Sequence, residues 1–168
     1  MKKFIFVILF FLSSCGLTPL HKVNHENYNI LSQINIGNVQ GTKNYIIRNY
    51  LEAEFNPNGL SKEKKFELDI IVTSGITGSL VQKDSTISNS RMELVANYTL
   101  KDSEKKKEIR SGVIKIVTNF EDNLSPYSSF AQKNKTYDNA LKEMVRSLKS
   151  HIIIALVNKN YIADENPS

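Results

Sequence analysis

Two alternating segments joined by a short charged turn constrain the fold of this 168-residue chain most strongly. From Met92 to Leu100 every second residue is apolar or aromatic, and the residues between them are polar except for Val95. Residues 102–108 are almost all charged, and a second segment from Ile109 to about Phe120 again carries apolar side chains on one side. Alternation of this kind indicates strands with one buried face. A connection this short requires antiparallel pairing, so the pattern predicts an antiparallel sheet with one buried face.

Upstream of this hairpin the sequence predicts a strand, a helix and another strand. The first strand is expected over about residues 29–39. The helix is expected from Thr42, whose hydroxyl can cap its first turn, to about Phe55. The next strand alternates over residues 66–72. Residues 74–90 are rich in Ser, Thr and Gly, and we interpret them as a long polar loop.

A long final helix is expected after a loop at residues 122–127, and it runs to about residue 158. Its apolar stripe steps by three or four residues: Tyr137, Leu141, Met144, Leu148, Ile152 and Ala155. The order β-α-β-β-β-α predicts an α+β fold, a two-layer sandwich in which two helices cover one face of a four-stranded, mostly antiparallel sheet. We expect a single domain over residues 29–160, a tether over 15–28 and a flexible tail over 161–168.

The first fifteen residues form a leader. Lys2 and Lys3 precede nine apolar residues, which is too short for a spanning helix. Leu12-Ser13-Ser14-Cys15 then has the form of a bacterial lipobox. We expect a signal peptide over residues 1–14 and lipid on Cys15, where two or three acyl chains would hold the protein on a membrane. An ordinary secretory signal with a chance cysteine is the alternative. Gly16, rather than Asp, favours the outer membrane, on its periplasmic side.

Composition argues against several classes of function. The formal net charge of +5 includes the two leader lysines and is too small for a typical nucleic-acid binder. The single cysteine, once lipidated, provides no thiol for a disulfide, a metal or catalysis. His21, His25 and His151 lack the companions of a metal site. Neither G-x-S-x-G nor S-x-x-K with its supporting motifs occurs. We therefore expect a non-enzymatic protein without cofactor or metal.

Several segments together resemble the lipopolysaccharide-assembly lipoprotein (LptE-like) family, especially its alphaproteobacterial branch. These segments occur in the family's order and spacing along nearly the whole mature chain. They are Cys15-Gly16-Leu17-Thr18-Pro19-Leu20, Ile47-Arg48-Asn49-Tyr50-Leu51, Phe66-Glu67-Leu68-Asp69-Ile70, Ser90-Arg91-Met92-Glu93-Leu94, Ala96-Asn97-Tyr98-Thr99-Leu100-Lys101-Asp102 and Phe130-Ala131. The departures are mild, and one of them is His21, which replaces an aromatic residue of the tether.

The resemblance implies a role that composition does not reveal. Proteins of this family sit in the lumen of the outer-membrane LptD β-barrel, which they plug and help to assemble, and they contact lipopolysaccharide. An LptD-like barrel and lipopolysaccharide are therefore the expected partners. A stand-alone periplasmic-face lipoprotein that binds lipid or another envelope component is the alternative.

Five cations are candidates for lipopolysaccharide binding. Arg91 follows the polar segment, and its guanidinium could bind a phosphate through two hydrogen bonds. Lys83 in that segment and Lys105, Lys106 and Lys107 in the charged turn could extend an anion-attracting rim. The alternatives are a solvated strand-end charge for Arg91 and a merely soluble turn for the three lysines, which Glu104 and Glu108 flank.

Overall fold

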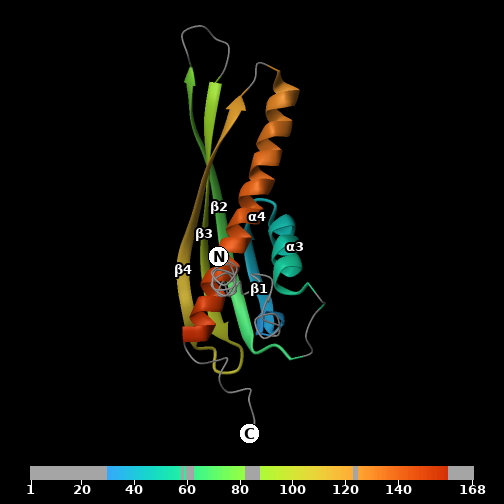
Figure 1. The fold of residues 1–168 in the computed structure, drawn as a ribbon, viewed down its shortest axis with the longest axis vertical. Coiled ribbons are helices and arrows are strands. Elements are labelled where there is room, and N and C mark those ends of the chain that lie inside the picture. The colour runs from blue at the N-terminus through green and yellow to red at the C-terminus, as the bar shows by residue number, and fades with distance from the viewer. Residues whose placement is uncertain (1–29, 58, 60–62, 82–87, 123–124, 159–168) are drawn as a thin grey trace, which may run out of the picture.

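The protein forms a four-stranded sheet covered on one face by helices (Figure 1). This computed structural model describes residues 30–57, 59, 63–81, 88–122 and 125–158, so the expected leader, tether and tail lie outside it. The elements are β1 (Ile34–Gly41), α3 (Asn44–Phe55), β2 (Phe66–Val81), β3 (Ser88–Asp102), β4 (Glu108–Asp122) and α4 (Pro126–Asn158). The strand order is β1-β2-β3-β4, with β1 parallel to β2 and the other pairs antiparallel. The predicted α+β fold is confirmed.

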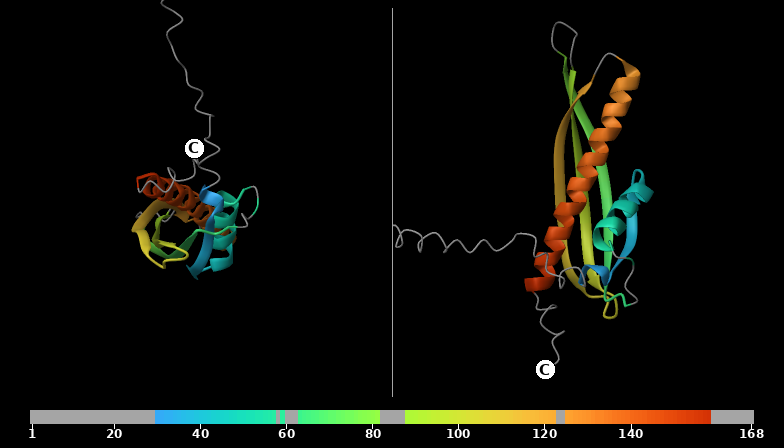
Figure 2. Two further views of the ribbon diagram at one scale, coloured as in Figure 1. Left: turned by 90° about the horizontal axis from the view of Figure 1, so that it is seen from below. Right: turned by 45° about the vertical axis from the view of Figure 1, so that its right-hand side comes forward.

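The core lies between the sheet and α4. Leu68, Leu94 and Leu100 on the inner face of the sheet are fully buried, as are Leu141 and Leu148 on the facing side of α4. Seen from below, the sheet curves, and α4 and α3 lie beside one another against it (Figure 2). The predicted alternation of β3 and the apolar stripe of α4 therefore build one core. One stripe residue was wrong: Ala155 is half-buried, and Leu156 is the buried residue of that turn.

The passage from β1 into α3 differs from the prediction. Residues 30–32 are helical and β1 begins only at Ile34, because consecutive Ile30 and Leu31 are both buried, which a strand with one covered face does not allow. Thr42 is not the helix cap. The capping position is held by Lys43 in a left-handed conformation (φ 58°), and no side chain caps the helix.

The expected polar loop at residues 74–90 was also wrong. β2 continues to Val81 and β3 begins at Ser88, so most of this segment is a long extension of the hairpin. Ladder hydrogen bonds with β3 pair one side of the backbone, and threonine and isoleucine suit a strand even where side chains are exposed, as they are at residues 74–77. We call the part of the sheet beyond Val72, together with the first half of α4, the distal half of the molecule.

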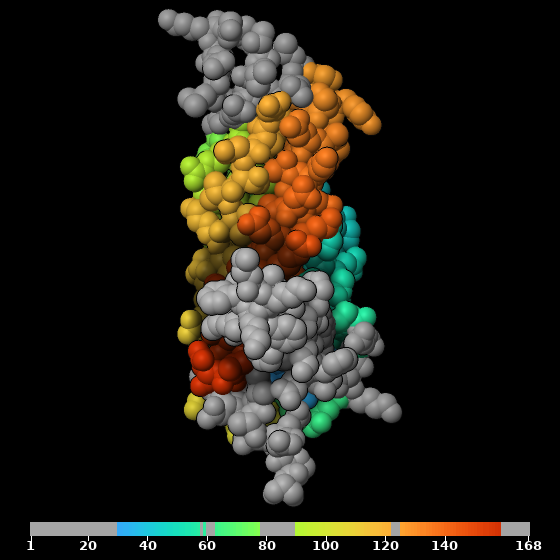
Figure 3. Space-filling model, in the orientation of Figure 1, coloured from blue at the N-terminus to red at the C-terminus, as the bar shows by residue number. Residues whose placement is uncertain are grey.

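α4 begins at Pro126, which we had placed in the preceding loop. Proline suits the first helical position because its missing N–H would have no partner there. In the space-filling view the first half of α4 lies against β4, and α3 begins only lower down (Figure 3). The distal half therefore lacks the cover that α3 gives the rest of the sheet.

Candidate functional site

Arg91 lies on the outer face of β3, opposite Thr77 of β2 and Asn119 of β4. Its side chain is exposed, and no carboxylate of the described residues is within ion-pair distance of it. The nearest acid along the strand, Glu93, is already paired with a lysine of β4 at 2.8 Å. Both neighbours across the sheet are uncharged, so the guanidinium of Arg91 is accessible to an external anion.

The three turn lysines, residues 105–107, lie at the other end of the sheet. Asp102, which ends β3, follows Arg91 by eleven positions, or roughly 36 Å of strand. Its carboxylate accepts hydrogen bonds from two turn N–H groups (2.8 and 3.0 Å), and the middle lysine is ion-paired with Glu67 (3.1 Å). The structure therefore does not bring Arg91 and the turn lysines together in one rim. Lys83 lies outside the described residues.

Two other cations have a structural role at the free edge of β1. The Gln33 carbonyl accepts a hydrogen bond from the Phe66 N–H and so faces β2, which means that alternate carbonyls face away from it. Lys64 and Arg48 donate to these outward carbonyls and to one in the adjoining bulge. The acceptors are Ser32 (2.7 Å) and Ile34 (3.1 Å) for Lys64, and Ile36 (2.9 Å) and Gly37 (2.6 Å) for Arg48. The arginine of the family-like helix motif thus caps a strand edge.

Asp69 holds the bulge of β1 from the neighbouring strand. Its carboxylate accepts hydrogen bonds from the Asn38 N–H (2.8 Å) and from Lys101 Nζ (2.7 Å). Burial acts to raise the pKa of Asp69, but the hydrogen bonds from Lys101 and Asn38 outweigh it, so this pKa lies below its ordinary value. The same hydrogen bond raises the pKa of Lys101. This pair stabilises the fold and is not free to bind a ligand.

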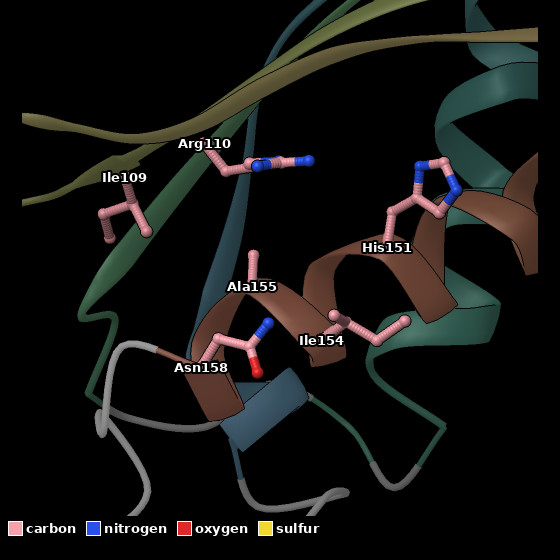
Figure 4. Close-up of a pocket in the computed structure, with 6 residues that line it drawn as sticks. All are labelled: Ile109, Arg110, His151, Ile154, Ala155 and Asn158. Carbon is pink, nitrogen blue, oxygen red and sulfur yellow. The ribbon is translucent and has the colours of Figure 1, made fainter.

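A cavity of about 340 Å³ lies between β4 and the last turns of α4. Arg110 reaches into it from the sheet side, and His151 rises from α4 (Figure 4). The ring of His151 lies 6.3 Å from that of Tyr98, centroid to centroid, and Ile154 is 56% exposed at the cavity wall. Arg110 was not singled out from the sequence, where it is one charge among several around the turn.

A larger groove, of about 450 Å³, opens in the distal half between α4 and the inner face of the sheet. Met92 and Tyr137 form a buried floor, whereas Ile76 and Phe130 are 43% and 65% exposed at its sides. We call this the distal groove. It exists because the apolar side chains of β2 and α4 continue beyond the point where α3 begins, so α3 does not cover them.

A cation is fixed at the rim of the distal groove. Lys43 Nζ donates a hydrogen bond to Asn134 Oδ1 (3.0 Å) and lies 5.4 Å from the centroid of the Tyr137 ring. The Tyr137 hydroxyl in turn donates to the Thr42 carbonyl (3.0 Å). Burial raises the pKa of Tyr137, and Asp138 adds to the rise, so the hydroxyl stays a donor. Lys133 is the second cation of the rim, and no carboxylate of the described residues lines this groove.

Other classes of site were not found in the described part of the chain. No group of three or more His, Cys, Asp or Glu side chains there could hold a metal ion. Within the same residues no helix is both long enough and apolar enough to cross a membrane.

Three solved structures share the fold. A candidate lipoprotein from Caulobacter crescentus has a TM-score of 0.59 at 16% identity, with 84% of this chain and 98% of that one covered. Rare lipoprotein B from Shewanella oneidensis has a TM-score of 0.58 at 8% identity, covering 68% and 89%. A minor lipoprotein from Acinetobacter baumannii has a TM-score of 0.54 at 10% identity, covering 72% and 90%.

Neither a protein-family model nor a curated protein sequence matches the chain. At 8–16% identity the structural likeness shows the fold alone. This protein thus has the architecture of three bacterial lipoproteins, over most of the length of each.

Proposed function

We propose that this protein is the lipoprotein subunit of an outer-membrane lipopolysaccharide translocon. In this role it occupies the lumen of an LptD-like β-barrel, assists assembly of the barrel and contacts lipopolysaccharide during its insertion. One observation carries the proposal. A leader followed by a lipobox that ends at Cys15 precedes a domain with the fold of three lipoproteins. The acyl chains on Cys15 would anchor the domain to the membrane that holds the barrel.

The family-like segments fall on the elements that build this fold. The Ile47–Leu51 segment supplies α3 residues to the core and the arginine that caps β1, and the Phe66–Ile70 segment supplies the buried side of β2. The Ala96–Asp102 segment supplies the second half of β3 and the acceptor that shapes the following turn. Each of these motifs therefore supplies residues that build the fold, which supports a family relationship beyond chance similarity.

The outer face of the sheet, which no described helix covers, suits a large, water-lined partner surface. Thr73, Asn97 and Asn119 on this face are exposed, neutral hydrogen-bonding residues. Val113 (60% exposed) and Ile71 (45% exposed) add apolar contact area among them. Such a mixture is typical of interfaces that are no more apolar than the general protein surface.

Affinity purification from detergent-solubilised membranes tests the proposal. The tagged full chain should recover a large outer-membrane β-barrel protein in comparable amount, identified by mass spectrometry. A second lipoprotein of the same membrane, carrying the same tag, is the control. Recovery of the chain without any barrel would contradict the proposal and favour a stand-alone lipoprotein.

Arg91 provides a test of the glycolipid contact. Arg91→Glu, alone or with Lys83→Glu, should weaken binding of lipopolysaccharide and leave the melting temperature unchanged, since exposed substitutions usually alter stability by less than about 0.5 kcal/mol. Arg146→Glu is the control, because it reverses an exposed arginine of α4, away from the outer face of the sheet. Binding through exposed charges should also weaken between about 0.1 M and 1 M salt, as the Debye length falls from about 10 to about 3 Å. Salt-independent binding that survives the reversals would remove Arg91 from the contact.

A further inference from the structure

Beyond Val72, strand β2 has a described neighbour on one side only. The ladder with β1 ends at the pair Gly41–Val72, whereas β2 continues to Val81 and stays paired with β3. From Thr73 to Thr77 this pairing is regular, and a register shift follows. The sheet therefore has an open edge at the point where β1 leaves it (Figure 1).

Gly41 determines where β1 leaves. Its φ of 141° is a conformation that other residues rarely adopt, and a Cβ on it would collide with the Val72 carbonyl. That carbonyl thus faces β1. Because alternate residues of a strand turn their N–H and C=O groups to the same side, Ser74 and Ile76 present these groups to the open edge.

The free edge of β1 is protected, and the free edge of β4 is protected over its first half, whereas residues 116–120 of β4 carry no charge and no proline. The outward carbonyls of β1 are capped by Lys64 and Arg48, and β4 carries Glu108, Arg110 and Lys115 in its first half. Charged side chains and capped edges are the usual means of preventing unwanted strand pairing. The segment from residue 73 to 77 contains no charge and no proline. An edge left open in this way is ready to accept another strand.

The distal groove lies beside this edge and would select the incoming sequence. Ser74 and Ile76 belong both to the edge and to the groove lining. Side chains that alternate toward the inner face would therefore enter a space floored by Met92 and walled by Phe130. Lys43 and Lys133 at the rim, without a lining carboxylate among the described residues, favour an acidic residue in the partner.

We propose that an extended strand of a partner polypeptide pairs with β2 at Ser74–Ile76 and continues the sheet where β1 ends. The strand places apolar side chains in the distal groove and a carboxylate near Lys43 and Lys133. In this mode of recognition the backbone supplies affinity and the alternate side chains supply specificity. The inference rests on the proposed function for its partner, which is the barrel subunit of the translocon.

The edge is tested in cells that produce the full chain with a photoreactive p-benzoylphenylalanine in place of Phe130 and a tagged barrel subunit. Illumination should join the two proteins. Ser74→Pro removes one open-edge N–H and no bond to β3, and it should lower the cross-link yield roughly three- to tenfold, which corresponds to the loss of about one hydrogen bond. Val117→Pro, which by the same alternation removes an N–H from the free edge of β4, should leave the yield unchanged.

A charge variant keeps the test decisive if Ser74→Pro impairs folding. Lys133→Glu should lower the same cross-link, whereas Lys135→Glu, an equally exposed lysine two positions further along α4, should not. If the barrel still co-purifies, unchanged cross-link yields with Ser74→Pro and Lys133→Glu would overturn the inference. A cross-link to a glycolipid instead of to the barrel protein would also overturn it. Absence of the barrel from the purified unmodified chain would overturn both this inference and the proposed function.

Discussion

Substitution of Gly112 by alanine tests the packing between β3 and β4, the two strands of the hairpin. Gly112 lies in β4 directly opposite Tyr98 of β3. A Cβ at Gly112 would lie 2.9 Å from Tyr98 Oη and 3.0 Å from Cε1 and Cζ of the ring. Carbon atoms in contact prefer about 3.5–4.0 Å. Because Tyr98 is only 3% exposed and packed in the core, its ring has little room to move away.

Two opposing effects determine the change in stability. Overpacking a well-filled site costs about 1–3 kcal/mol. Alanine also restricts the unfolded chain, which stabilises the protein by about 0.4–1 kcal/mol where the native backbone suits it. Gly112 is not among the residues with positive φ, so this gain applies. We expect Gly112→Ala to lower the free energy of unfolding by about 1–2 kcal/mol.

The assay is urea unfolding of the full chain in detergent, repeated in a Tyr98→Leu background. Without the aromatic ring the clash disappears, so there Gly112→Ala should be neutral or stabilising by up to about 1 kcal/mol. The sign of the effect should thus change between the two backgrounds. An equal loss in both would show that Tyr98 is not the cause and would refute the packing argument.

Two further substitutions test the core and the Asp69 pair. Leu148→Asp places a carboxylate at a fully buried position of α4 and should unfold the domain, since an unpaired buried charge costs several kcal/mol. Lys142→Asp, at an exposed position of the same helix, is the control. A melting temperature of Leu148→Asp within a degree or two of that of the unmodified protein or of this control would contradict the prediction. The lowered pKa of Asp69 means that its charge stabilises the fold above about pH 4, and that this contribution is lost as the pH falls through the folded-state pKa. Asp69→Asn should therefore reduce the urea midpoint at about pH 7 but have less effect near pH 3, and equal losses at both would count against the pair.

The sequence by itself determined the elements with a strict period. Alternation in β2 up to Val72, in β3 and in much of β4 required strands, because only period two places every apolar residue on one face. The steps of three and four in α4 required a helix in the same way. The short charged turn required antiparallel pairing. The order of elements and the layer architecture followed from these local signals. Cys15 and its lipobox are likewise local features, and they lie outside the described residues.

The candidate sites depended on tertiary structure. Residues 74–81 carry no alternation, and they form a strand because hydrogen bonds to β3 pair one side of their backbone. Five cations appeared equivalent in the sequence. Arg91 stands before the strand predicted from Met92, and residues 105–107 stand in the turn that follows it. The strand itself therefore separates them, and the structure confirms this. The distal groove joins Lys43 to Asn134 and Tyr137, more than ninety positions apart, and no local pattern predicts that contact. Periodicity in the sequence shows which face of an element is buried. Where a strand ends and where a sheet edge stays open depend on the length of the neighbouring strand in the folded sheet.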